Sequence, residues 1–443
     1  MCVLLKHYLE RDFGCRVILT SAHYLGRTLE DLIPLVRPDL VIPSKAGQVP
    51  QVQRVIKEHR YRFSTVPKIG FFLGDPPAYG PFETQFRHVL LGKSVDWSEV
   101  SFYFCLNDFL RQDILSSTNA PPDRVHSAGV PRFDFYFPPL NSLIVPRERL
   151  LAKYGLDPEK RTISIASTPI NLPRDRLPGG FQDLGLSYEH GQGQTISWGD
   201  LLKETEAVRQ ALLDQAMTLA RKRPDWQVIV RPHPNEDAKF LEDTVRSWAL
   251  PNVAVMTNEY VWDVLNAADL HIHRYCTTGF EAWLLDKPTV DFRPTDYARE
   301  GYPDYTHGNV RCDSPTELLP LVEDLLSSDQ WRKRLAPERR KVLAGWFQAD
   351  GQSTWRHAEI IGKVLNTGGA KAGGRSLGER LAVEYREARD AIQMAWKRRR
   401  YGALDHKGRA LPWFTRAEER GWNRAISGVI SRRRGGPAGA GAS

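Results

Sequence analysis

Two patterns of apolar residues alternate along the first 366 residues of the chain. Short runs of β-branched and aromatic residues are typical of buried strands, and apolar positions three or four residues apart are typical of helices. The strands expected in the first part are 16–20, 39–43, 68–74, 101–107 and 125–129. The helical patterns between them include 51–61 and 108–117. Strands separated by helices predict βαβ units and a parallel sheet with helices on both faces.

A second series of the same kind begins at residue 146, after a proline-rich segment at 131–140. Its expected strands are 162–168, 227–233, 253–258, 270–274 and 289–292, with a long helix around 201–223. The pattern therefore predicts an α/β protein with two doubly wound, Rossmann-like parallel-sheet domains, at 1–140 and 141–366. Residues 367–443 follow as a separate tail.

Two segments depart from this pattern. A doubly wound domain usually opens with a strand, but residues 1–13 have apolar positions at helical spacing and Gly14 is suited to end a helix. Either the first strand is absent or the true start of the protein lies upstream, and we favour the second. The 32 residues from 169 to 200 are rich in Gly, Pro and Gln, which predicts a long irregular loop of the kind that often carries function.

Composition narrows the class of protein. The chain is 41% hydrophobic, and no apolar run approaches the ~18 residues that a membrane-spanning helix needs. The first residues do not resemble a secretory signal, and the five cysteines include no C-x-x-C pair, which argues against disulfides and a zinc site. We therefore expect a cytoplasmic protein.

The net charge of +8 is distributed unevenly. Residues 368–443 contain 17 Lys and Arg against 7 Asp and Glu, whereas the preceding residues contain 44 against 46. A nucleic-acid-binding protein more often carries basic charge on its folded body, so no specific nucleic-acid partner is expected.

The stretch VIVRPHPNE, residues 228–236, ends an expected strand with a cation and an imidazole. In an open parallel sheet, ligands bind outside the carboxyl ends of the strands, which is where Arg231 and His233 are expected. Pro232 and Pro234 hold the histidine in an extended loop, and the two donors suit an anionic oxygen such as that of a phosphate. The alternative is a strand-end turn with a solvated arginine and a structural histidine.

A second group of polar residues follows the expected strand 270–274, at the start of the helix FEAWLLD. Thr277 or Thr278 stands at the N-cap, where the first-turn amides can bind an anion. Gly279 permits a ligand to approach the backbone, and Glu281 could accept hydrogen bonds from sugar hydroxyls. The alternative is an ordinary N-cap followed by a dipole-favoured glutamate. Because both groups end strands of one sheet, together they outline a cleft for a nucleotide mono- or diphosphate.

Four sequence blocks, in order, resemble those of bacterial surface-carbohydrate biosynthesis proteins. They are AGVPRFDFY (128–136), RPHP (231–234), TTGFEAWLLDKP (277–288) and ADGQSTWRHAEII (349–361). The resemblance covers about 125–361. It implies the GT-B fold of glycosyltransferases, in which two Rossmann-like domains face each other across the active site. The His-Pro pair also resembles that of CMP-Kdo and CMP-sialic acid transferases and of CDP-glycerol glycerophosphotransferases.

The resemblance implies a nucleotide-activated donor, linked to CMP, CDP or UDP, in the second domain. His233 would contact the donor phosphate and stabilise the departing nucleotide. Thr277, Thr278 and Gly279 would seat the same phosphate, and Glu281 would hold the ribose. No D-x-D motif stands at a strand end, so no obligatory metal and no other cofactor is expected.

The catalytic base is the least defined part of the predicted site. An inverting transfer requires a carboxylate within reach of the acceptor hydroxyl, placed on the first domain. The related proteins tend to have an acidic pair followed by glycine, and GFFLGDPPAYGPFE (70–83) departs from that pattern. Asp75 is the candidate, with Glu83 behind it. The alternative is that Asp75 starts a Pro-Pro turn. The departure leaves open an altered reaction or an inactive relative.

His271 and His273 alternate on one expected strand and so face the same side of the sheet. No carboxylate or cysteine accompanies them at ligand spacing, so structural histidines are favoured over a metal pair. His273 and Arg274 remain secondary candidates for the edge of the donor cleft.

The tail begins with a flexible linker, GGAKAGG, and mixes arginines with Trp413, Phe414 and Trp422. Basic residues with aromatic neighbours suit the anionic cytoplasmic face of a membrane. A solvated basic extension is the alternative, and RNA binding is less favoured.

These features together predict a glycosyltransferase that is cytoplasmic or peripheral on the inner membrane. It would transfer from a nucleotide sugar to a glycan or lipid-linked acceptor in capsule or lipopolysaccharide biosynthesis, by an inverting, metal-independent reaction. The alternatives are an isomerase like the nucleotide-sugar 2-epimerases and a catalytically inactive GT-B-fold binding protein.

Overall fold

The computed structural model describes most of the two predicted domains and one helix of the tail. The described residues are 2–19, 33–43, 49–63, 65–72, 96–167, 187–190, 194–233, 236, 238–274, 276–295, 306–366 and 416–435.

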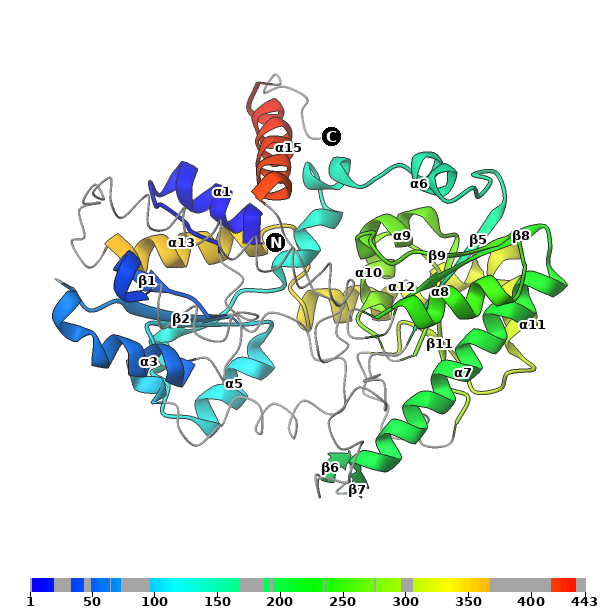
Figure 1. The fold of residues 1–443 in the computed structure, drawn as a ribbon, viewed down its shortest axis with the longest axis horizontal. Coiled ribbons are helices and arrows are strands. Elements are labelled where there is room, and N and C mark those ends of the chain that lie inside the picture. Colours follow the sequence, from blue (N-terminus) through cyan, green and yellow to red (C-terminus); the bar gives the residue numbers. More distant parts are fainter. Residues whose placement is uncertain are drawn as a thin grey trace.

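The first half of the chain forms a four-stranded parallel sheet in the order β1-β2-β3-β4. Figure 1 labels β1 and β2 of this sheet, with α3 and α5 on one side and α1 on the other. The strands are β1 (Leu40–Val41), β2 (Lys68–Phe72), β3 (Phe102–Cys105) and β4 (Val125–Ser127), and the helices are α1 (Cys2–Asp12), α3 (Val49–Glu58) and α5 (Asp108–Ser117). Phe102 and Phe104 pack in one apolar cluster with residues of α1, whereas Tyr103 and Cys105 pack with residues of α3 and α5. The sheet is therefore covered on both faces, as alternation along a strand requires.

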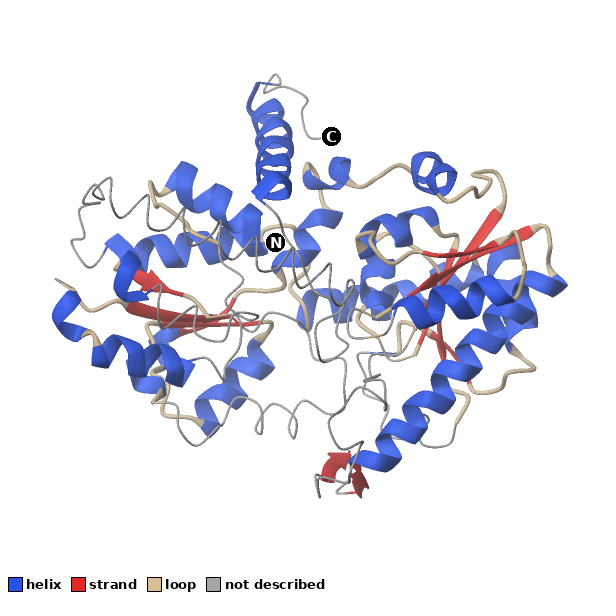
Figure 2. Ribbon diagram, viewed as in Figure 1, coloured by secondary structure: helices blue, strands red, loops and turns tan. Residues whose placement is uncertain are grey.

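The second half forms a six-stranded parallel sheet in the order β12-β11-β10-β5-β8-β9. Figure 2 shows its strands in red, with helices around them. Its strands are β5 (Arg161–Ala166), β8 (Trp226–Arg231), β9 (Val253–Val255), β10 (Leu270–His273), β11 (Thr289–Phe292) and β12 (Val310–Cys312). Its helices are α6 (Arg147–Lys153), α7 (Trp198–Lys222), α8 (Ala238–Ser247), α9 (Val261–Ala267), α10 (Thr278–Leu284), α11 (Leu318–Ser327) and α12 (Gln330–Gly345). This is the strand order of the Rossmann fold. The predicted α/β class with two parallel sheets is confirmed.

Three sequence predictions need correction. Residues 16–19 form no strand. Their composition suits a strand, but composition alone does not show whether a segment has a strand to pair with. The predicted loop 169–200 contains an antiparallel pair, β6 (Ser187–His190) and β7 (Gln194–Ser197), and α7 begins at Trp198. Strand β12 was not predicted, since its three residues include a charged one.

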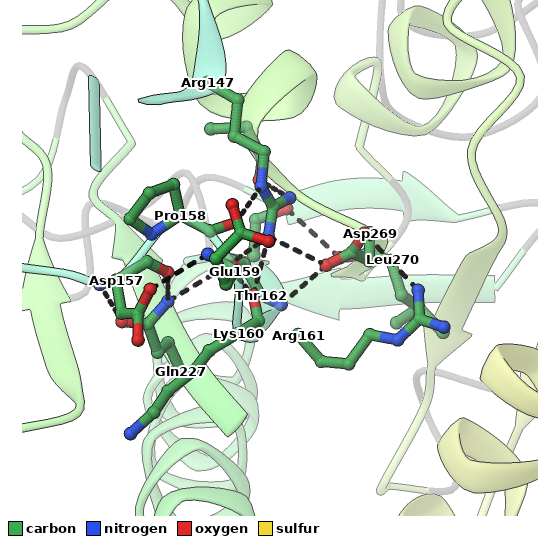
Figure 3. A network of polar contacts seen from close by, with 12 residues as sticks. Arg147, Asp157, Pro158, Glu159, Lys160, Arg161, Thr162, Gln227, Asp269 and Leu270 are labelled. Atoms are coloured by element: carbon green, nitrogen blue, oxygen red, sulfur yellow. Dashed lines mark hydrogen bonds and ion pairs between the residues drawn. The ribbon is translucent and has the colours of Figure 1, made fainter. Parts of the chain in front are cut away.

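A network of polar contacts fastens the amino-terminal edge of the second sheet (Figure 3). The guanidinium of Arg147, at the start of α6, donates to the Lys160 carbonyl at 2.6 Å and to the Asp269 carboxylate at 3.1 Å. Asp269 also accepts from the Thr162 amide at 2.8 Å. The network joins α6, β5 and the start of β10, and it lies at the edge opposite to the one where ligands bind in such sheets.

The segment that crosses between the halves is tied to the last helix of the second series, α13 (Ser353–Asn366). Asp134, within the 3₁₀ segment η6 (Pro131–Tyr136), is 3% exposed. Its two carboxylate oxygens accept the amides of Ser353 at 3.0 Å and Thr354 at 2.6 Å. The carboxylate therefore satisfies two otherwise unpaired donors at a helix start. It also joins two of the blocks that carry the sequence resemblance.

We expect Asp134→Ala to lower the free energy of unfolding by about 2 kcal/mol, because two buried amides lose their acceptor. Urea denaturation followed by circular dichroism measures the change. Asp329→Ala is the matched control, since Asp329 stands at the N-cap of α12 without a side-chain capping bond. A loss no larger than that of the control would contradict the capping role.

Helix α15 (Arg416–Gly435), from the tail, packs against α1 and the crossing segment (Figure 1). Glu419 pairs with Lys6 at 2.7 Å, and Ile426 is fully buried. The Trp422 indole donates to the Tyr260 hydroxyl at 3.0 Å and meets Phe135 edge-on. Trp422 thus contacts the crossing segment and the second half of the chain. None of the described helices is long and apolar enough to cross a bilayer.

Candidate functional site

The candidate site lies at the carboxyl edge of the second sheet. There the strand order reverses, because β8 and β9 lie on one side of β5, and β10, β11 and β12 lie on the other. Ligands of open α/β sheets bind at this switch point. Strand β5 lies between β8 and β10, so the axes of β8 and β10 are about 10 Å apart.

His233 follows β8 in a loop that is fastened by one carboxylate. The His233 amide donates to Glu236 Oε2 at 3.0 Å, and the Glu236 amide donates back to the His233 carbonyl at 2.9 Å. The hydroxyl of Ser167, just after β5, donates to Glu236 Oε1 at 2.7 Å. The loop is therefore tied to the end of the strand that separates the two groups, and the His233 side chain stays half-buried.

Arg231 has its own partners within the protein. Its Nη1 donates to the carbonyls of Met256 at 2.8 Å and Thr257 at 3.3 Å, beyond the end of β9. Burial lowers the pKa of Arg231, and the nearby Glu259 carboxylate opposes that effect. The guanidinium therefore links β8 to the chain that follows β9.

The start of α10 is largely occupied by contacts of its own. Thr277 stands at the predicted N-cap, but its side chain makes no capping hydrogen bond. The Thr278 hydroxyl lies 2.8 Å from Nε2 of His271. The amides of Gly279 and Phe280 donate to the carbonyls of Cys276 and Thr277, both at 3.1 Å. In this conformation the amides of Gly279 and Phe280 are therefore already paired within the turn. A phosphate at this place stays a prediction.

Gly279 allows a close approach, but the group that approaches is a side chain of the protein. A Cβ at position 279 would lie 2.4 Å from Nε2 of His273. The glycine is therefore required for α10 to pack on β10.

Glu281 joins the second half of the chain to the crossing segment. Its carboxylate is 1% exposed and pairs with the Arg132 guanidinium at 3.0 Å. The Tyr136 hydroxyl donates to its other oxygen at 2.6 Å. Burial and this carboxylate raise the pKa of Tyr136 well above its ordinary value, so the phenol remains a donor. Arg132 also lies 3.5 Å from the Thr277 hydroxyl.

The two histidines of β10 have hydrogen-bond partners within the protein. His271 Nδ1 lies 2.8 Å from the Ser164 hydroxyl. His273 accepts from the Cys276 amide at 3.2 Å and lies 3.2 Å from the Asn309 side-chain oxygen. Arg274 has its guanidinium 4.0 Å from Glu204 of α7. Among the described residues, no group of three His, Cys, Asp or Glu side chains could hold a metal ion.

The candidate bases Asp75 and Glu83 lie outside the described residues, so their distance from this edge stays untested. Sequence reasoning missed Ser167, Glu236, Arg132 and Tyr136. The signal for Glu236 was its place three residues after His233, from which a carboxylate can reach back to the loop backbone. Nothing in the sequence pairs Arg132 with Glu281, which lie 149 positions apart.

Comparison with known proteins finds no matching family model and no matching curated protein. Several solved structures are similar. One is the wall teichoic acid polymerase TagF, at 15% identity and TM-score 0.40, over 62% of this chain and 60% of that one. Others are a putative UDP-N-acetylglucosamine 2-epimerase from Listeria monocytogenes and UDP-GlcNAc 2-epimerase from Methanocaldococcus jannaschii, each at 12% identity over 78% of this chain. They have TM-scores of 0.45 and 0.46 and are covered over 81% and 83% of their length.

The chain thus spans less than two thirds of the first polymerase structure. Similarity of this degree says nothing about the substrate. What the described residues establish is an α/β chain with a Rossmann-order second sheet and a polar switch point.

Proposed function

We propose that the protein is a glycosyltransferase that binds a nucleotide-activated donor at the carboxyl edge of its second sheet, for the synthesis of a bacterial surface polysaccharide. The observation that carries the proposal is the placement of two separately predicted groups at one switch point. His233 follows β8 and Thr277 precedes α10, with the end of β5 between them. The described geometry supports a shared ligand, since both groups end strands of one sheet.

The spacing of the two groups favours a diphosphate over a monophosphate. The axes of β8 and β10 are about 10 Å apart, and a diphosphate offers two anionic groups along such a distance where a monophosphate offers one. We therefore propose a CDP- or UDP-linked donor ahead of a CMP-linked one. His233 would donate to one phosphate and stabilise the departing nucleotide. Thr277 and Thr278 would contact the other.

The predicted ribose contact of Glu281 would require a rearrangement. Its carboxylate is 1% exposed and already accepts from Arg132 and Tyr136. A sugar hydroxyl would have to donate to this carboxylate beside these two residues or in place of one of them. Access would require the crossing segment to shift, which would couple donor binding to the position of the first domain.

The remaining parts of the proposal concern the acceptor, the base and the membrane. A glycan or lipid-linked acceptor would bind on the first domain, where Asp75 or Glu83 would take its proton. The basic tail would hold the enzyme near an anionic membrane surface. The side chains of Arg420 and Arg424 of α15 are exposed, which fits that role, although Trp422 is engaged within the protein.

A nucleotide panel tests the proposal. We expect CDP and UDP to raise the melting temperature of the wild type and to bind in calorimetry. His233→Ala should weaken that binding by about tenfold to a hundredfold, the worth of one hydrogen bond to a charged group. His307→Ala is the matched control, because His307 is exposed and stands before β12, at the opposite edge of the sheet. Failure of every nucleotide to bind the wild type would contradict the proposal.

A second measurement separates transfer from isomerisation. Incubation with a UDP-sugar alone, followed by chromatography of the nucleotide sugars, should leave the sugar unchanged if the protein transfers to an acceptor. Interconversion of the free UDP-sugar in the absence of any acceptor would indicate an epimerase instead.

A further inference from the structure

The loop between β8 and α8 contains a buried acid that the proposed catalytic scheme does not use. Glu236 is 1% exposed, although it stands at the edge of the sheet where ligands are expected. A buried carboxylate is stable only when hydrogen bonds compensate for its lost hydration. The contacts that compensate it here are therefore informative about its role.

The contacts that the structure describes for Glu236 lead to the His233 loop and to the neighbouring strand. One carboxylate oxygen accepts the His233 amide at 3.0 Å, and the other accepts the Ser167 hydroxyl at 2.7 Å. The Glu236 amide returns a hydrogen bond to the His233 carbonyl at 2.9 Å. The backbone of His233 is thus held at both its donor and its acceptor by one residue.

The neighbouring strand completes the connection. The Ser167 amide donates to the Arg231 carbonyl at 2.9 Å, which extends the β5–β8 pairing by one residue. Ser167 therefore holds the loop through its backbone on one side and through its hydroxyl on the other. Both proline neighbours of His233 lack an amide, so its single N–H is the donor available to anchor this stretch.

We propose that Glu236 is a positioning residue that fixes His233 at the switch point, and that Ser167 supports it. This inference rests on the proposed function for the role of His233 in nucleotide binding. Glu236 itself does not touch the nucleotide, since its two oxygens face the loop backbone and Ser167. A negative charge at this edge repels an anionic ligand, so Glu236 would favour binding only by holding the His233 loop in place.

Two substitutions separate geometry from charge. In Glu236→Gln, the amide oxygen still accepts the His233 amide, and the new amino group donates to the Ser167 hydroxyl, which can rotate to accept. In Glu236→Ala, both acceptors are lost. The positioning role therefore predicts that Glu236→Gln keeps the hydrogen bonds to His233 and Ser167 that Glu236→Ala removes. Glu242→Ala is the control, because Glu242 of α8 accepts from Thr257 instead, at 2.8 Å.

The first readout is hydrogen exchange of the His233 amide in the full-length protein, resolved by fragmentation of the peptide that contains it. We expect exchange to be faster by about tenfold or more in Glu236→Ala, because the amide loses its acceptor. Glu236→Gln and Glu242→Ala should exchange like the wild type. Unchanged exchange in Glu236→Ala, or equal acceleration in Glu236→Gln, would overturn the inference.

The second readout is the calorimetric affinity for CDP and UDP. Glu236→Ala should weaken binding by about tenfold, and Glu236→Gln should bind at least as tightly as the wild type. Normal affinity in Glu236→Ala with accelerated exchange would overturn the link between loop position and binding. If the wild type binds no nucleotide, the proposed function fails, and the exchange measurement still decides whether Glu236 holds His233.

Discussion

Replacing Arg132 with alanine is expected to lower the free energy of unfolding by about 3 kcal/mol, because it leaves the buried Glu281 carboxylate without its cation. The carboxylate is 1% exposed and Arg132 is 3.0 Å away. Removing one partner of a buried pair costs far more than the pair contributes, since the remaining charge cannot regain its hydration. Urea denaturation at pH 7, followed by circular dichroism, measures the loss.

A second substitution tests this explanation. Glu281→Gln removes the charge and keeps an acceptor for the Tyr136 hydroxyl. The double variant Arg132→Ala/Glu281→Gln should therefore be more stable than the single variant Arg132→Ala. Arg246→Ala is the matched control, because Arg246 pairs with Asp243 at a 74% exposed position, where ion pairs contribute less than about 1 kcal/mol. If the double variant is no more stable than Arg132→Ala, the cost does not arise from an unpaired carboxylate.

The same pair explains how the two halves of the chain are joined. Arg132 and Tyr136 lie in the segment that leaves the first sheet, and Glu281 lies in the helix at the switch point. A ligand hydroxyl that donates to the Glu281 carboxylate would do so beside these two residues or in place of one of them. Donor binding and the relative position of the two domains would then be linked through one carboxylate.

The second sheet could be predicted well because its strands are short, apolar and separated by clear helical patterns. The segment QVIVR lies in β8 and LHIH forms β10, and both bury successive residues, which point to the two covered faces of the sheet. The spatial order could not be read from the chain. That β5 lies between β8 and β10 depends on how the crossovers pack, which local patterns do not encode.

The positions of Arg231 and His233 in the fold were predictable, whereas the contacts of the candidate site residues were not. A strand end followed by Arg and His indicates the ligand edge of a parallel sheet, and both residues do lie there. The partners of Gly279 and Glu281 come from β10 and from the crossing segment. Such contacts are set by tertiary packing, so a spacing rule along the sequence cannot identify them.

Acidification is expected to destabilise the protein strongly, because three histidines are buried in their neutral form. Burial lowers the pKa values of His271 and His273, and it lowers that of His357 to about 3. In the unfolded chain each histidine has a pKa near 6.5, so the unfolded state takes up protons first as the pH falls. Their stabilising effect is complete above about pH 6.5 and is lost progressively below it. Between pH 7 and 5.5 His357 alone should cost about 1.3 kcal/mol, and His271 and His273 add to this loss in the same direction.

His357→Phe isolates one of these contributions. The ring of His357 lies 4.1 Å from that of Phe104, centre to centre, and phenylalanine has a similar shape. The Ser353 carbonyl, which lies 2.7 Å from Nδ1 of His357, keeps its helical acceptor role in α13. The loss of stability between pH 7 and 5.5 should shrink by about 1.3 kcal/mol in this variant, measured by urea denaturation at both pH values. An identical pH dependence in the variant and the wild type would show that His357 already binds a proton in the folded state, against the burial that holds it neutral.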